Sequence, residues 1–211
     1  MFNTEKTISD FVIQNNILVA YRGIERNVVL PHGIVKIGEN VFVYSNIKSI
    51  VIPDGVIAIG DSAFRFCPDL KSVTIPDSVQ SIGNRAFMDC DNLENITLPM
   101  HLTQIGEGAF EGCKRLKSVT IPDNVEYICD SAFAHCTSLT DVVIPESVRV
   151  IGCKAFHQCT NLKNLSIPDS AIVLDKNDVM HNLSQKLPFV FSIIGFVLVI
   201  GIVILKVTRV F

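Results

Sequence analysis

The strongest constraint on the fold of this chain is a proline that returns at an almost constant step. Pro31 and Pro53 are 22 residues apart, and every later step is 23 residues. The members of this column are Pro31, Pro53, Pro76, Pro99, Pro122, Pro145 and Pro168. A period in the low twenties, held over six units, predicts a solenoid, in which each unit buries its apolar face against the next unit.

Other residues keep the same step and fix the phase of the repeat. Phenylalanine recurs at Phe42, Phe64, Phe87, Phe110, Phe133 and Phe156. Leucine recurs at Leu70, Leu93, Leu116, Leu139 and Leu162, and cysteine at Cys67, Cys90, Cys113, Cys136 and Cys159. Glycine recurs at Gly38, Gly60, Gly83, Gly106 and Gly152, with Cys129 in the fifth slot. We expect the apolar columns to stack into one continuous core.

A single unit divides into three short pieces. Residues 70–76, LKSVTIP, alternate apolar and polar residues and predict a short strand that its proline ends, because proline cannot donate to a strand ladder. Residues 79–83, VQSIG, predict a second extended piece. Residues 84–90, NRAFMDC, are predicted to form one or two helical turns that point Phe87 and Cys90 inward.

The pattern Leu-x-x-Val-x-Ile-Pro-x-x-Val-x-x-Ile-Gly-x-x-Ala-Phe-x-x-Cys resembles the BspA-type leucine-rich repeat family over residues 27–174. The resemblance implies an α/β solenoid of about six 23-residue coils, with a parallel β-sheet on one face and short helical turns on the other. It also implies the usual role of the family, which is to bind other proteins or extracellular matrix at cell surfaces. One solenoid fold serves many partners, so this role is an analogy.

The pattern fades at both ends of the repeat. Two apolar runs within residues 8–30 predict a hairpin that covers the first coil, because terminal units would otherwise expose core. We therefore divide the chain into an N-terminal capping hairpin (1–30), the solenoid (31–174), a polar linker (175–186), a single transmembrane helix (187–205) and a short tail (206–211).

Residues 187–205 carry no charged side chain, and at about 1.5 Å per residue they are long enough to cross a bilayer. The first residues predict no secretory signal peptide, because they lack a basic region followed by a long apolar run. A tail anchor with the solenoid in the cytosol is the default, whereas the family resemblance favours the cell surface. Lys176 and Lys186 precede the span and Lys206 and Arg209 follow it, so the flanking charges favour neither side.

The composition argues against several classes of function. The net charge is −3, which does not suit a nucleic-acid-binding protein. The glycines recur singly, once per coil, whereas a phosphate-binding loop needs several together. The five histidines fall at different repeat phases, apart from His135 and His157 on adjacent coils. We predict no catalytic residue, no metal ligand and no cofactor.

The cysteine column is predicted to be structural. No Cys-x-x-Cys pair is present, and parallel side chains about 4.8 Å apart form a ladder where zinc needs a tetrahedron. Each column cysteine is therefore interpreted as a small buried hydrophobe. Cys129 and Cys153 lie outside the column, one slot apart on adjacent coils, which leaves open a disulfide or a thiol-dependent enzyme.

The remaining candidates for function are the outward-facing polar residues of the main strands. The predicted partner-binding residues are Lys71, Ser72, Thr74, Glu94, Asn95, Thr97, Lys117, Ser118, Thr120, Asp141 and Lys163. The partner is predicted to be another protein or a matrix component. A structural spacer without a specific ligand is the alternative, because the same face also suits plain solvation.

Overall fold

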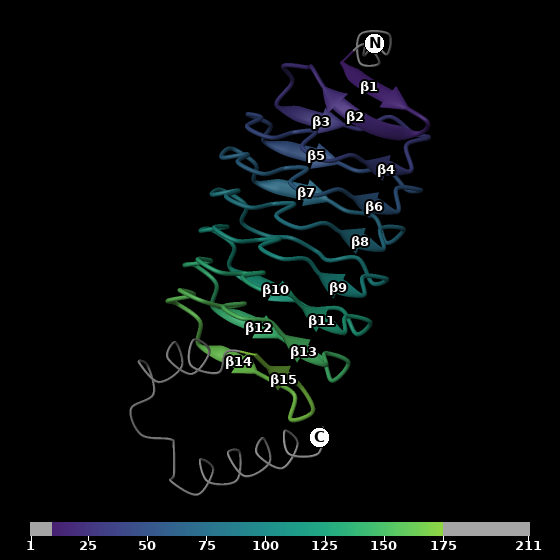
Figure 1. Cartoon of the computed structure of the whole chain (residues 1–211). Helices are drawn as coiled ribbons and strands as arrows, with labels where there is room; N and C mark the ends of the chain where they lie inside the picture. Colours follow the sequence, from purple (N-terminus) through teal and green to yellow (C-terminus); the bar gives the residue numbers. More distant parts are fainter. Residues whose placement is uncertain (1–9, 175–211) are drawn as a thin grey trace, which may run out of the picture.

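Each repeat forms one coil of a stack, and the stack runs from one end of the structure to the other (Figure 1). The computed structural model describes residues 10–174 of the 211-residue chain. Fifteen short strands lie within these residues, and between them the coils turn without forming a helix in any described part of the chain. The predicted solenoid is confirmed.

One face of the stack carries a nine-stranded sheet, built from the N-terminal hairpin and the second extended piece of the successive units. All its pairs after the first are parallel, and an inward isoleucine such as Ile59 or Ile82 stacks on its equivalent in the next coil. Its strands, in spatial order, are β1 (Phe11–Gln14), β2 (Ile17–Tyr21), β4 (Lys36–Ile37), β6 (Ala58–Ile59), β8 (Ser81–Ile82), β9 (Gln104–Ile105), β11 (Tyr127–Ile128), β13 (Val150–Ile151) and β15 (Ile172–Val173).

The main strands form a second parallel face, which corrects the prediction of a sheet on one face only. This face consists of two three-stranded sheets. The first contains β3 (Asn27–Val29), β5 (Ser49–Val51) and β7 (Ser72–Thr74), and the second contains β10 (Ser118–Thr120), β12 (Asp141–Val143) and β14 (Asn164–Ser166). Residues 95–98 lie between them and join β7 through a single bridge from Ser72 to Asn95. This coil differs from its neighbours in carrying Met100 after its proline, where they carry Asp77 and Asp123.

The third face corrects the prediction of helical turns. Its segments are successive tight turns, such as the one closed by the amide of Met88 on the carbonyl of Arg85. Two residues per coil have a left-handed φ of 54–72°, a conformation typical of the third residue of a type II turn. These two columns are Asn40, Ser62, Arg85, Gly108, Ser131 and Lys154, and Tyr44, Phe66, Asp89, Gly112, His135 and Gln158. The amides of Arg85, Phe87 and Asp89 donate to the next coil at 2.7–2.8 Å, so no continuous helix forms.

The core is a ladder of apolar columns inside the three faces. The six phenylalanines of the repeat are at most 1% exposed, and their rings lie parallel with centroids 5.0–5.5 Å apart. The described part of the chain buries no polar or charged residue. At the N-terminal end, Tyr21 of the β1–β2 hairpin packs its ring on Phe42, with centroids 5.1 Å apart. The hairpin therefore covers the end of the ladder.

The cysteine column does more than fill space. The five thiols are at most 1% exposed, and each donates a hydrogen bond to a phenylalanine carbonyl oxygen about one coil earlier in the chain. For Cys90 the acceptor is the carbonyl of Phe64, at 3.1 Å. The interpretation as a small hydrophobe was therefore incomplete, because the thiol also satisfies a buried backbone oxygen.

Replacing Cys90 with serine is expected to lower the free energy of unfolding by about 1–2 kcal/mol. The hydroxyl loses apolar contact but retains a donor for the carbonyl of Phe64, whereas Cys90→Ala loses the donor and leaves that oxygen with one partner fewer. Urea denaturation of both variants measures the difference. A serine variant much less stable than the alanine variant would contradict the role of the hydrogen bond.

The predicted linker (175–186), transmembrane helix (187–205) and tail (206–211) lie outside the described residues. Within residues 10–174 no helix is long and apolar enough to cross a membrane.

Candidate interaction surfaces

The predicted partner-binding residues lie on the main-strand face, where parallel register aligns equivalent side chains. Ser118 pairs with Asp141, which pairs with Asn164. Ten of the eleven predicted residues are exposed. Glu94 is half-buried, and its Oε2 lies 3.3 Å from Nζ of Lys117. Whether these residues bind a partner stays a prediction.

The C-terminal part of this face holds an ionised carboxylate. Asp141 accepts hydrogen bonds from the hydroxyl of Thr140 and the side-chain amide of Asn164, both at 2.6 Å. These bonds, with a smaller contribution from the charge of Lys163, hold the pKa of Asp141 below its usual value. The face therefore presents a fixed negative charge at this end.

The interruption between the two sheets creates a hollow in the middle of the face. It has a volume of about 390 Å³ and is lined by Asn95, Ile96, Thr97, Leu98, Met100, Ser118, Thr120 and Pro122. Four of the predicted binding residues, Asn95, Thr97, Ser118 and Thr120, thus surround one depression. Met100 is 59% exposed beside it and supplies an apolar contact that the sequence analysis did not single out.

Exposed valines are a second feature that the sequence analysis missed. Val29 and Val51 occupy the strand position that Thr74 occupies in the next coil, and they are 64% and 41% exposed. They could have been predicted from the sequence, because the same position of the repeat holds threonine in the central coils and is therefore expected to face solvent. This strand position is therefore apolar in the first two main strands and polar in the central coils.

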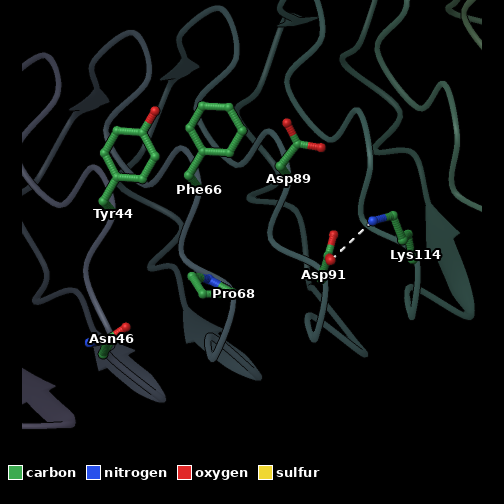
Figure 2. Close-up of a pocket in the computed structure, with 7 residues that line it drawn as sticks. All are labelled: Tyr44, Asn46, Phe66, Pro68, Asp89, Asp91 and Lys114. Atoms are coloured by element: carbon green, nitrogen blue, oxygen red, sulfur yellow. Dashed lines mark hydrogen bonds and ion pairs between the residues drawn. The ribbon is translucent and has the colours of Figure 1, made fainter.

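The turn face contains a further hollow that sequence reasoning did not find. Figure 2 shows its lining residues, which are Tyr44, Asn46, Phe66, Pro68, Asp89, Asp91 and Lys114. Its volume is about 520 Å³. The sequence contained a signal for it, which is a departure from the repeat. The left-handed turn position that Gly112 occupies in a later coil is occupied by Tyr44 and Phe66 in the first two coils.

The structure offers little for thiol or metal chemistry. All seven cysteines are free. Burial raises the pKa of the Cys159 thiol to about 12, and burial followed by the charge of Asp130 raises the pKa of Cys129, so both thiols are mostly protonated at neutral pH. The rings of His135 and His157 lie edge to face, with their centroids 5.6 Å apart. Within residues 10–174 no group of three or more metal-binding side chains converges.

Comparison with known proteins agrees with this geometry. The family model described as BspA type leucine rich repeat region matches in six copies, over residues 12–140 and 58–183. The chain belongs to the BspA-type leucine-rich repeat family. No curated protein sequence matches this BspA-type chain.

Solved structures of bacterial leucine-rich repeat proteins share the fold. One from T. pallidum is 26% identical, with a TM-score of 0.74, and the match covers 86% of this chain and 94% of that one. One from Bacteroides ovatus is 30% identical, with a TM-score of 0.65, covering 77% and 52%. A leucine rich cell surface protein from Faecalibacterium prausnitzii is 32% identical, with a TM-score of 0.56, covering 73% and 51%. The match spans about half the length of the last two proteins.

Proposed function

We propose that this BspA-type chain is a non-enzymatic binding protein whose main-strand face docks another protein or a matrix component. The observation that carries the proposal is the central hollow, where Asn95, Thr97, Ser118 and Thr120 surround about 390 Å³ beside the exposed Met100. Concave sites that combine a few polar groups with an apolar contact are typical of binding surfaces. Methionine suits such a site because its flexible side chain adapts to a partner.

We further propose that residues 187–205 anchor the chain in a membrane by a single helix. The support is their uncharged, apolar composition and their length. The side of the membrane on which the solenoid lies is a separate question. The relative from Faecalibacterium prausnitzii is described as a cell surface protein, which favours the outer side of the membrane over the cytosolic side. Protease protection of the solenoid in sealed vesicles distinguishes the two.

Alanine at Lys71, Glu94 and Lys117 together is expected to weaken binding of a recovered partner severalfold, while the protein stays folded. Glu94 and Lys117 form an ion pair at the protein surface, and such pairs contribute at most about 1 kcal/mol to stability. The measurement is the affinity of the tagged full chain for that partner, with folding checked by circular dichroism. Undiminished binding would exclude this surface, and the failure of a folded chain to bind any partner would favour a spacer.

A further inference from the structure

The hollow on the turn face has an aromatic wall. Tyr44 is 70% exposed, and its ring lies parallel to that of Phe66 with centroids 4.9 Å apart. A neighbouring hollow of about 410 Å³ shares Tyr44 and Asn46 as lining residues and contains Ile24, which is 93% exposed. Tyr44 therefore stands between two depressions, and one of them is bordered by an exposed aliphatic side chain. We refer to the two depressions together as the turn-face groove.

The other wall of the groove is acidic. Asp91 pairs through Oδ2 with Nζ of Lys114 at 3.0 Å, and its Oδ1 has no hydrogen-bond partner among the described residues. Asp89 makes no ion pair within residues 10–174, and its carboxylate lies over Gly112, where a side chain would collide with it. Two carboxylates thus share the hollow with one lysine.

One cation of the chain already lies on this pair of aromatic rings. The guanidinium carbon of Arg65 lies 4.5 Å from the centroid of the Phe66 ring. A cation at this distance from an aromatic ring is attracted by the negative face of the ring. The second ring of the pair, Tyr44, carries no such cation within the described part of the chain.

We propose that the turn-face groove binds a basic side chain of a protein partner, with an adjacent apolar side chain of that partner resting on Tyr44 and Ile24. This inference rests on the proposed function, because it names the chemistry of the partner. Asp89 supplies the counter-charge, and the Tyr44 ring supplies a surface for the cation. Arginine fits better than lysine, because its planar guanidinium can bind a carboxylate through two nitrogens while it stacks on an aromatic ring.

The charges around Asp89 give binding a defined pH dependence. Burial and the neighbouring Asp91 raise the pKa of Asp89, while the charges of Lys114, Arg65 and His135 oppose this. A bound cation favours the ionised carboxylate and so lowers its pKa. Affinity is therefore expected to rise as the pH rises through the pKa of free Asp89 and to level off above it.

The three tyrosines of the chain provide a direct readout. The full chain labelled with 3-fluorotyrosine contains fluorine probes at Tyr21, Tyr44 and Tyr127 only. We expect N-acetyl-arginine amide to shift the Tyr44 fluorine resonance in a saturable manner, with no change at Tyr127 on β11. The neutral analogue N-acetyl-citrulline amide, which has nearly the same shape, is expected to leave the Tyr44 resonance unchanged. The Tyr44→Phe variant identifies the resonance by its loss.

Variants of the acidic wall distinguish specific binding in the groove from a general electrostatic effect. Asp89→Asn is expected to weaken arginine amide binding severalfold and to remove its pH dependence. Glu146→Gln makes the same charge change on a distant turn and is expected to have no effect. Loss of binding in both variants would show a non-specific charge effect and overturn the proposal.

Two further outcomes would also overturn it. One is the absence of any Tyr44 shift with either arginine or lysine amide at tens of millimolar. The other is a shift produced by a neutral oligosaccharide such as maltotriose and not by the cations, which would assign the groove to carbohydrate. A recovered protein partner that binds Asp89→Asn undiminished would refute this inference and leave the proposed function standing. Arginine amide binding without any protein partner would support the groove and count against the proposed function.

Discussion

Replacing Phe110 with alanine is expected to lower the free energy of unfolding by about 3–5 kcal/mol. Its side chain is fully buried, and its ring lies between Phe87 and Phe133 with centroids 5.4 and 5.3 Å away. The cost combines lost apolar burial with a cavity that rigid neighbouring coils cannot close. Because each coil contacts only its neighbours, a cavity at this place also weakens the coupling between the two halves of the stack.

Urea denaturation followed by circular dichroism measures this effect, and Tyr127→Ala is the matched control. Tyr127 is 43% exposed on β11, so its loss is expected to change stability by less than about 1 kcal/mol. A cost below about 1 kcal/mol for Phe110→Ala would mean that the coils relax into the cavity, contrary to the rigid ladder described above.

Replacing Gly60 with alanine is expected to lower the free energy of unfolding by about 1–3 kcal/mol. This is the opposite of the usual effect, because alanine in place of glycine stabilises a protein wherever its side chain fits without strain. A Cβ at Gly60 would lie 2.7 Å from the carbonyl carbon of Gly38 and 2.9 Å from the amide nitrogen of Glu39. These are backbone atoms of the preceding coil, so they cannot rotate away as a flexible side chain would. The coil must shift, and the strand pairing beside it is strained.

Gly106→Ala is the graded control for this prediction. The same Cβ at Gly106 would meet backbone atoms of Gly83 and Asn84 at 3.0–3.1 Å, so a smaller displacement suffices and a smaller cost is expected. The fifth slot of this column holds Cys129, which shows that a side chain is accepted at one coil. Equal costs for Gly60→Ala and Gly106→Ala in the same urea experiment would contradict the close approach of coils as the cause.

The glycine column shows how far sequence reasoning reached. The repeat placed Gly83 at the end of the second extended piece, and in the structure it directly follows β8. Glycine is needed in this column because consecutive coils approach each other within contact distance there. The requirement is therefore one of space and not of backbone flexibility. That distance depends on the stacking of coils and cannot be obtained from one unit alone.

The turn face was predicted less well. Residues 84–90 have the apolar spacing of a helix, since Phe87 and Cys90 are three apart, and both side chains are indeed buried. Local periodicity cannot show that the amide of Phe87 donates to Ala109 of the next coil at 2.8 Å. This competing hydrogen bond replaces the helical one, and it exists only after two coils have stacked.

The candidate sites divide in the same way. The outward positions of the main strands followed from alternation, and the structure finds ten of the eleven predicted residues exposed and one, Glu94, half-buried. The hollow between Thr97 and Thr120 did not follow, because it arises where pairing between two coils is interrupted. The hollow on the turn face likewise brings together Tyr44, Phe66, Asp89 and Lys114, which come from four successive coils.

The sequence by itself determined the repeat, the apolar columns that form the core and the BspA-type family. The reason is that apolar residues recurring at a step of 23 residues can be buried together only when the coils stack on one another. Only the tertiary structure decided which surfaces are hollow, which turns replace helices and which carbonyls the cysteines satisfy. These features depend on distances between neighbouring coils, and such distances are set when the coils pack against one another.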